Sequence, residues 1–205
     1  LTIPEAVRAT LERATKEHAI PALTARAQLA EDGVPELHIF DVIGSEGWFD
    51  EQKKDATQEG VAKFLAEHKH KDIRVLVNSP GGLAYEGIAM YNLLVAHHGK
   101  VVTRNIGMAG SAASIILMAG DTVEMADNAT LFIHRAMTLA IGNRDDLQAT
   151  IEFLDLLDEQ IAGIYVARTG KHRATIRDML KGDGKKDGTF MGAEQAKRDK
   201  FIDTI

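Results

Sequence analysis

The sequence predicts a single α/β domain with a mostly parallel sheet, and three observations lead to that prediction. Strand-like runs alternate with helix-like segments along most of the chain. The runs at residues 73–77 and 101–106 are rich in β-branched residues, as in strands that are buried on both faces of a parallel sheet. The chain has 205 residues, of which 45% are hydrophobic and 26% charged, enough for one sizeable core and typical of a globular protein.

The sequence of residues 1–68 predicts a helix, a β segment and a second helix. Residues 1–20 match a short amphipathic helix that begins after Pro4 and forms an arm or a lid. Residues 25–43 have the alternation of a hairpin or of two successive strands. A polar helix is expected at about residues 50–68.

A strand, a turn and a helix then follow one another twice. After the strand at 73–77, the sequence Asn78-Ser79-Pro80-Gly81-Gly82 predicts a turn, and the spacing of apolar residues up to Val95 predicts a helix. After the strand at 101–106, residues 107–110 predict a second turn, and residues 111–118 an alanine-rich helix that packs tightly.

The remaining elements are two short strands and one long helix. The strands are expected at residues 122–125 and 131–133. Apolar residues at helical spacing predict a helix over residues 145–168, about 36 Å long at 1.5 Å per residue. A helix of this length extends beyond a small core, so we expect a second subunit to cover the rest of its apolar stripe. Residues 182–188 are expected to form a flexible basic loop.

Composition excludes several classes of function. Lys and Arg total 24 against 30 Asp and Glu, so the net charge of −6 disfavours nucleic-acid binding. The absence of cysteine removes disulfides, thiolate metal sites and cysteine nucleophiles. The histidines at 68–70 and 97–98 lack further ligands at useful spacing, and no nucleotide-binding motif is present, so we expect neither a metal nor an organic cofactor.

The sequence also predicts a cytoplasmic protein without membrane contact. No apolar run approaches the roughly 20 residues that span a bilayer. Residues 1–5 lack the basic and then apolar pattern of a secretory signal.

Ser111 is the best placed of only four serines. It stands where a predicted turn becomes a helix, beside backbone N–H groups that have no acceptor within the helix. Such groups stabilise a developing oxyanion, although a structural N-cap is the commoner role of a serine there. His134 follows a predicted strand and is either the general base for Ser111 or a structural histidine. The glycines Gly81 and Gly82 either point N–H groups into a cleft or form a plain tight turn.

Three segments together resemble the ClpP family of serine peptidases. They are Asn78-Ser79-Pro80-Gly81-Gly82, Gly107-Met108-Ala109-Gly110-Ser111-Ala112-Ala113-Ser114 and Phe132-Ile133-His134, in the order and spacing of that family. The resemblance covers about residues 36–203. Segments 141–147 and 167–171 are similar to the phage and prophage branch associated with head maturation.

The resemblance implies a ClpP/crotonase-like superhelix of ββα units, in which the long helix is the handle through which rings of subunits stack. Residues 36–205 would form the peptidase domain, and residues 1–35 an N-terminal arm or a processed or gating segment. Gly81, Gly82 and Ala112 would supply the N–H groups of the oxyanion hole. Leu83 and Ala84 would begin the strip that pairs with an extended peptide.

The resemblance also implies a catalytic triad. Ser111 would be the nucleophile and His134 the base. The family has an Asp two residues before an aromatic-apolar pair, here Phe190 and Met191, where this chain has Gly188. Asp187, one residue further back, is therefore the expected acid, and Asp183 is an alternative.

The partners implied are a polypeptide substrate, further copies of the chain in stacked rings, and either an AAA+ unfoldase or capsid and scaffold proteins, in the host cytoplasm if the chain is phage-encoded. Two other interpretations stay open: a crotonase-type acyl-CoA enzyme and a catalytically inactive ring subunit. Arg135 and Ala136 replace the Gln-Pro that follows the histidine in better-known members, which affects the wall of the substrate cleft.

Overall fold

The computed structural model describes residues 27–29, 32–44, 56–184 and 187–205. The helix predicted at residues 1–20 lies outside the described residues, as do most of the segment 1–35 and the first part of the helix predicted at 50–68. Among the described residues, no helix is both long and apolar enough to cross a membrane.

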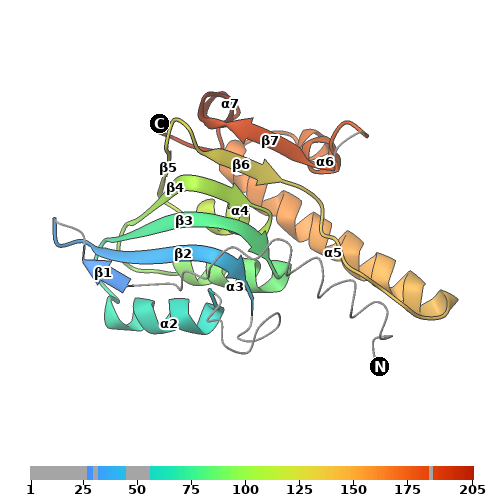
Figure 1. Cartoon of the computed structure of the whole chain (residues 1–205), viewed down its shortest axis with the longest axis horizontal. Helices are drawn as coiled ribbons and strands as arrows, with labels where there is room; N and C mark the ends of the chain where they lie inside the picture. The colour runs from blue at the N-terminus through green and yellow to red at the C-terminus, as the bar shows by residue number, and fades with distance from the viewer. Residues whose placement is uncertain (1–26, 30–31, 45–55, 185–186) are drawn as a thin grey trace.

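Within the described residues, seven strands form a mixed sheet at the centre of the domain (Figure 1). The strands β2 to β6 pair in parallel, whereas β1 and β7 are antiparallel to their neighbours at the two ends of the strand order. This arrangement confirms the predicted α/β class with a mostly parallel sheet. Across the sheet the order is β1 (Ala27–Leu29), β2 (Pro35–Ile43), β3 (Ile73–Gly82), β4 (Val101–Gly110), β6 (Thr130–Ile133) and β7 (Thr189–Gly192), with β5 (Thr122–Met125) also paired to β4.

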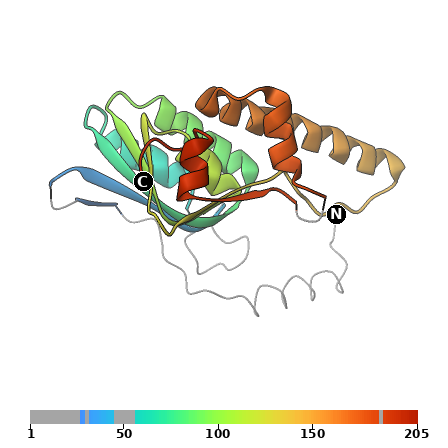
Figure 2. The ribbon, with the colours of Figure 1, turned by 90° about the horizontal axis from the view of Figure 1, so that it is seen from above.

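The described helices α2, α3 and α4 lie on one face of the sheet (Figure 2). The predicted long helix is present as α5, and it projects beyond the end of the strands (Figure 1). The bounds of the helices are α2 (Gln58–Glu67), α3 (Ala84–Val95), α4 (Ala112–Leu117), α5 (Arg144–Thr169), α6 (Arg173–Lys181) and α7 (Ala193–Arg198).

Helix α4 is the centre of the core. All six of its residues are buried, and it packs against α3, β3, β4 and α5. The small side chains of Ala112 and Ala113 permit this close approach, as the composition of the segment predicted. The N-terminus of α4, where Ser111 is located, is therefore held on several sides.

The two predicted turns are instead the last residues of strands β3 and β4. Gly81 and Gly82 continue β3 at φ values of 110° and 155°. A Cβ atom on Gly82 would lie only 1.9 Å from the carbonyl oxygen of Ile43. The glycines therefore allow the neighbouring strand β2 to approach, and the chain leaves the sheet only at Leu83, whose N–H donates to that same oxygen.

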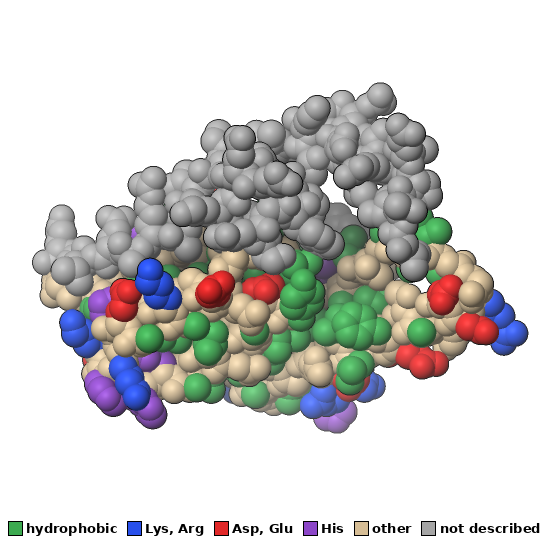
Figure 3. Space-filling model, turned by 90° about the horizontal axis from the view of Figure 1, so that it is seen from below, with side chains coloured by type: hydrophobic (Ala, Val, Ile, Leu, Met, Phe, Trp, Pro, Cys, Tyr) green, Lys and Arg blue, Asp and Glu red, His purple; other side chains and the backbone are tan. Residues whose placement is uncertain are grey.

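Helix α5 has well-defined ends and an uncovered apolar side. Asn143 and Asp146 form a capping box at its start, and Gly170 ends it in the left-handed conformation. Leu157 and Ile161 are buried, but nearer the N-terminus Leu147 and Ile151 are exposed, so the described part of the chain leaves part of the predicted stripe uncovered. Figure 3 shows hydrophobic side chains exposed across the middle of one face of the molecule.

Candidate active site

Ser111 connects β4 to α4 in a backbone conformation that is uncommon for a residue with a side chain. Its φ is 51° and its ψ is −125°, outside the regions that L-residues ordinarily occupy. Its N–H donates to the carbonyl oxygen of Phe132 at 2.9 Å, and its hydroxyl makes no capping bond to α4. Ser111 therefore occupies the N-cap position of α4 without capping the helix through its side chain.

His134 lies directly after β6 and faces Ser111. Its Nε2 is 2.7 Å from the Oγ of Ser111, a strong hydrogen-bond distance. The ring of Phe132 stacks on the imidazole, with centroids 4.9 Å apart. Burial lowers the pKa of His134, and the nearby carboxylate of Asp187 opposes that effect. A lowered pKa favours the neutral imidazole, and the tautomer with its proton on Nδ1 can accept the hydrogen bond of the serine at Nε2.

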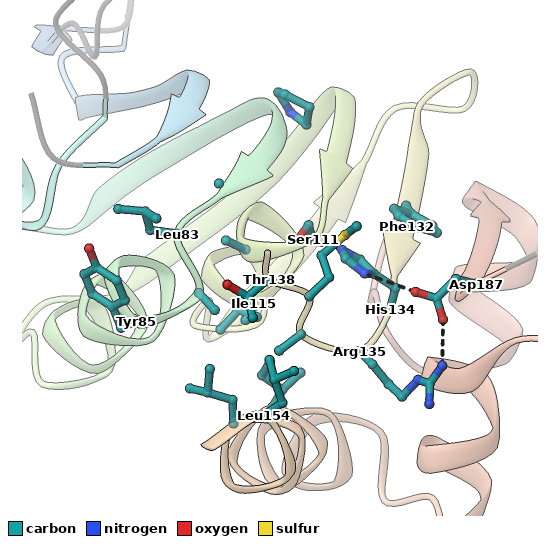
Figure 4. A pocket seen from close by; sticks show the side chains of 18 of the residues that line it. Leu83, Tyr85, Ser111, Ile115, Phe132, His134, Arg135, Thr138, Leu154 and Asp187 are labelled. Carbon is teal, nitrogen blue, oxygen red and sulfur yellow. Dashed lines mark hydrogen bonds and ion pairs between the residues drawn. The ribbon is translucent and has the colours of Figure 1, made fainter. Parts of the chain in front are cut away.

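Asp187 is shared between His134 and Arg135 (Figure 4). Its Oδ2 is 3.8 Å from Nδ1 of His134, an ion-pair distance that exceeds a hydrogen bond. Its Oδ1 accepts a hydrogen bond of 3.2 Å from the guanidinium of Arg135. About half of the Asp187 side chain is exposed. Asp183, the other acid considered, lines a separate pocket with Thr175 and is not part of the cavity described below.

Gly81 keeps open the space in front of the N-terminus of α4. A Cβ atom on Gly81 would lie 2.7 Å from the carbonyl oxygen of Gly110 and 3.0 Å from the nitrogen of Ala112. Ala112 is the first residue of α4, so its N–H has no acceptor within the helix. The N–H of Gly81 itself donates to Oγ of Ser79 at 3.1 Å and is therefore engaged inside the strand.

A cavity of about 710 Å³ adjoins these residues. The predicted binding residues Leu83 and Ala84 both line it. Leu83 lies at the end of β3, and Leu154 of α5 lies opposite (Figure 4). Other apolar residues complete the wall, among them Tyr85, Ile115, Met137, Leu139, Phe153 and Leu157. The cavity therefore combines a predominantly apolar interior with a rim that carries Ser111, His134 and Asp187.

One residue beside the site was missed by sequence reasoning. Asp158 of α5 accepts a hydrogen bond of 2.7 Å from the N–H of Ala136, two residues after His134. Burial raises the pKa of Asp158. The feature of the sequence that could have indicated Asp158 is its place beside Leu157 and Ile161, two positions of the apolar stripe of the helix. Its partner is a backbone group, which no side-chain pattern reveals.

Comparison with known protein families gives a match over most of the chain. The family described as Clp protease matches residues 48–205. The matched range contains Ser111, His134 and Asp187, the glycines of β3 and the whole of α5. On this match the chain belongs to the Clp protease family.

Proposed function

We propose that this protein is a serine endopeptidase of the ClpP type, in which Ser111 is the nucleophile, His134 the general base and Asp187 the acid that orients the histidine. The observation that carries the proposal is the 2.7 Å contact between Nε2 of His134 and Oγ of Ser111. A neutral histidine at this distance is what activation of a serine hydroxyl requires. No step of this chemistry needs a metal or an organic cofactor.

The first half of the reaction forms an acyl-enzyme. Oγ of Ser111 attacks the carbonyl carbon of the peptide bond while Nε2 of His134 takes the hydroxyl proton. The imidazolium then gives that proton to the amine of the leaving peptide as the C–N bond breaks. In the second half, water gives a proton to His134 and attacks the ester, and the proton returns to Ser111 as the new carboxyl end departs.

The N–H groups of Ala112 and Gly82 are the proposed donors to the oxyanion. The N-terminus of α4 favours negative charge, and donors of this kind act without reorganisation when charge develops. The resemblance implied that Gly81 also donates its N–H to the oxyanion. Because that N–H is engaged by Ser79, we assign Gly81 a steric role instead. Its lack of a side chain leaves room for the oxyanion beside Ala112.

The substrate is proposed to be an extended polypeptide. Leu83 and Ala84 follow the last strand residue of β3 and line the cavity, where they would contact that peptide through their side chains. The N–H and the carbonyl oxygen of Leu83 are already engaged by Ile43 and Gly87. An apolar side chain next to the cleaved bond would enter the cavity between Ile115 and Leu154. Its burial there would contribute roughly 1.5–3 kcal/mol to binding.

Stacked rings of this chain are the proposed assembly. Exposed apolar side chains continue from the segment before α5 onto the helix, where a second copy would cover them. They are Met137, Leu139, Ile141, Leu147, Ile151, Phe153 and Leu156. The exposed fraction of Met137 is 76%, and it belongs to a run of exposed apolar side chains of the kind that marks an interaction surface.

Processing of phage capsid or scaffold proteins is the proposed biological role. The support is the similarity of segments 141–147 and 167–171 to the phage branch of the family. An AAA+ unfoldase that delivers substrates is the other proposed partner, with residues 1–35 as a gating or processed segment. The host cytoplasm is the proposed location.

A catalytically inactive ring subunit is the second candidate, and one observation favours it. The 3.8 Å between Nδ1 of His134 and Oδ2 of Asp187 leaves the imidazole N–H without a hydrogen bond to this acid. Membership of the Clp protease family favours a peptidase over the acyl-CoA enzyme considered above.

Covalent labelling separates these candidates. The intact, assembled protein would be incubated with a fluorophosphonate and weighed by mass spectrometry, beside Ser111→Ala and, as a matched control, Ser45→Ala. One adduct that is lost only in Ser111→Ala is expected of the peptidase. A wild-type protein that gains no adduct would contradict the proposal and favour the inactive subunit.

A further inference from the structure

The side chain of Asp158 links the long helix to the segment just after β6 that carries the histidine. Its Oδ1 lies 2.7 Å from the N–H of Ala136, a length typical of a hydrogen bond to an ionised carboxylate. Ala136 is two residues beyond His134, so this bond acts on the backbone that determines where the imidazole stands. Asp158 itself does not reach Ser111 and is no part of the triad proposed above.

The segment after β6 is held by two helices. The N–H of Arg135 donates to the carbonyl oxygen of Leu180 in α6 at 3.2 Å, and the next N–H donates to Asp158 in α5. The first bond is between backbone groups, which every residue type supplies. The second depends on one side chain, so a single substitution can remove it.

Asp158 also places negative charge toward His134. The groups that act on Asp158 electrostatically are Arg135, which favours its ionised form, and Asp155 and Asp187, which disfavour it. The groups that act on His134 in this way are Asp187 and Asp158. Both carboxylates thus act electrostatically on the imidazole, and both favour the imidazolium that forms when Ser111 loses its proton.

We propose that Asp158 is a positioning residue for His134: it holds the segment after β6 through the N–H of Ala136, two residues from the imidazole, and thereby keeps a second carboxylate near it. The inference rests on the proposed function, because it concerns how the histidine of that site is placed. It accounts for an acidic side chain that is half-buried beside the apolar wall of the cavity.

Two variants of Asp158 separate its hydrogen bond from its charge. Asp158→Asn keeps an oxygen that accepts from Ala136 and removes the charge, whereas Asp158→Ala removes both. Asp155→Asn is the matched control, since Asp155 lies one turn earlier on the exposed side of α5. Within the described part of the chain, no hydrogen bond or ion pair joins Asp155 to residues 135 and 136.

The measurement is the second-order rate of fluorophosphonate labelling at Ser111 as a function of pH. We expect Asp158→Ala to slow labelling at pH 8 by about 10–100-fold, the scale of a small misplacement of a catalytic group. Asp158→Asn should recover most of that rate. The fall of its labelling rate on the acidic side of the pH profile should move to lower pH, because a charge that favours the imidazolium is gone. Asp155→Asn should stay within about twofold of the wild type.

Three results would overturn the inference. The labelling rates of Asp158→Ala and Asp155→Asn could be equal, Asp158→Asn could label as slowly as Asp158→Ala, or the acidic side of the pH profile of Asp158→Asn could match that of the wild type. Melting temperatures of all variants separate these results from unfolding. If the wild type itself is not labelled, the proposed function fails and the inference is decided by NMR titration of His134. Asp158→Asn must then lower the pKa of His134 more than Asp155→Asn does, and equal values would overturn the inference.

Discussion

Gly81 and Ser111 approach each other so closely that a Cβ atom on Gly81 would lie 2.5 Å from the Cβ of Ser111. Contacts this short do not occur between real side chains, so the last residues of β3 can lie beside the nucleophile only because position 81 has no side chain. The same Cβ would stand 3.0 Å from the nitrogen of Ala112, in the space proposed for the oxyanion.

Gly81→Ala is therefore expected to slow fluorophosphonate labelling of Ser111 by at least about 10²-fold, the scale of losing an oxyanion donor. Gly33→Ala is the control for backbone strain, because Gly33 also has a positive φ but a Cβ atom on it would meet nothing within 4 Å. Labelling of Gly81→Ala at the wild-type rate would contradict the proposed oxyanion site.

The pH dependence of labelling should reveal the buried histidine. His134 must be neutral to accept the proton of Ser111, and burial lowers its pKa below the usual 6.5. The rate should thus be level near neutral pH and fall with a midpoint below 6.5. Stability should also decrease on acidification, since the unfolded chain binds the proton at a higher pH than the folded one. A midpoint above the usual value would show that Asp187 outweighs burial.

Asp187→Asn should lower the labelling rate by about 10–100-fold, less than the roughly 10⁴-fold known for a buried, hydrogen-bonded triad acid. The smaller effect follows from the 3.8 Å separation and from the exposure of Asp187. Asp183→Asn is the control and should leave the rate unchanged. If Asp183→Asn instead labels more slowly than Asp187→Asn, Asp183 is the acid of the triad.

Assembly should depend on the exposed apolar side of α5. Ile151 is 52% exposed, and Ile151→Asp would place a charge in the contact proposed between copies of the chain. We expect this variant to sediment as a smaller species than the wild type. Gln160→Asp adds a charge at an exposed polar position of the same helix and should not change the sedimentation. Equal sedimentation of the wild type and both variants would contradict an interface through Ile151.

Tyr165→Phe should destabilise the fold by about 1 kcal/mol. The hydroxyl of the fully buried Tyr165 lies 2.7 Å from Oγ of Ser114, and burial raises its pKa well above the usual 10.0. The loss should stay modest because Ser114 also donates to the carbonyl oxygen of Ser111. Urea unfolding measures the change, with Tyr91→Phe at the half-buried Tyr91 as the control. A loss equal to that of the control would show that the bond contributes nothing.

The parts of the fold that follow from periodicity were predicted well. The β-branched runs of β3 and β4 and the apolar spacing of α5 are local patterns, and each is present at the expected place. Strand β7 and helices α6 and α7 were not predicted as elements. Strand β7 has only four residues, and its pairing partner β6 lies more than fifty positions earlier in the chain. No pattern within β7 indicates that pairing.

The sequence predicted those residues of the site that their type and spacing identify. Ser111 and His134 were selected from sequence and lie in contact. The sharing of Asp187 with Arg135 and the bond from Asp158 to Ala136 were not predicted. Both depend on the course of the chain after β6. The glycines of β3 were predicted as a turn because glycine marks turns and close backbone approach equally well.

The hydrogen bond from the N–H of Ser111 to the carbonyl oxygen of Phe132 gives the protein a built-in reporter of an intact site. Phe132 belongs to β6, the strand that presents the histidine, so local opening of β6 from β4 releases this amide and separates the two proposed catalytic residues in the same event. Protection of one amide from hydrogen exchange therefore measures the free energy that keeps the site assembled. Hydrogen–deuterium exchange at the Ser111 amide would measure that free energy in the resting protein, without substrate and without turnover.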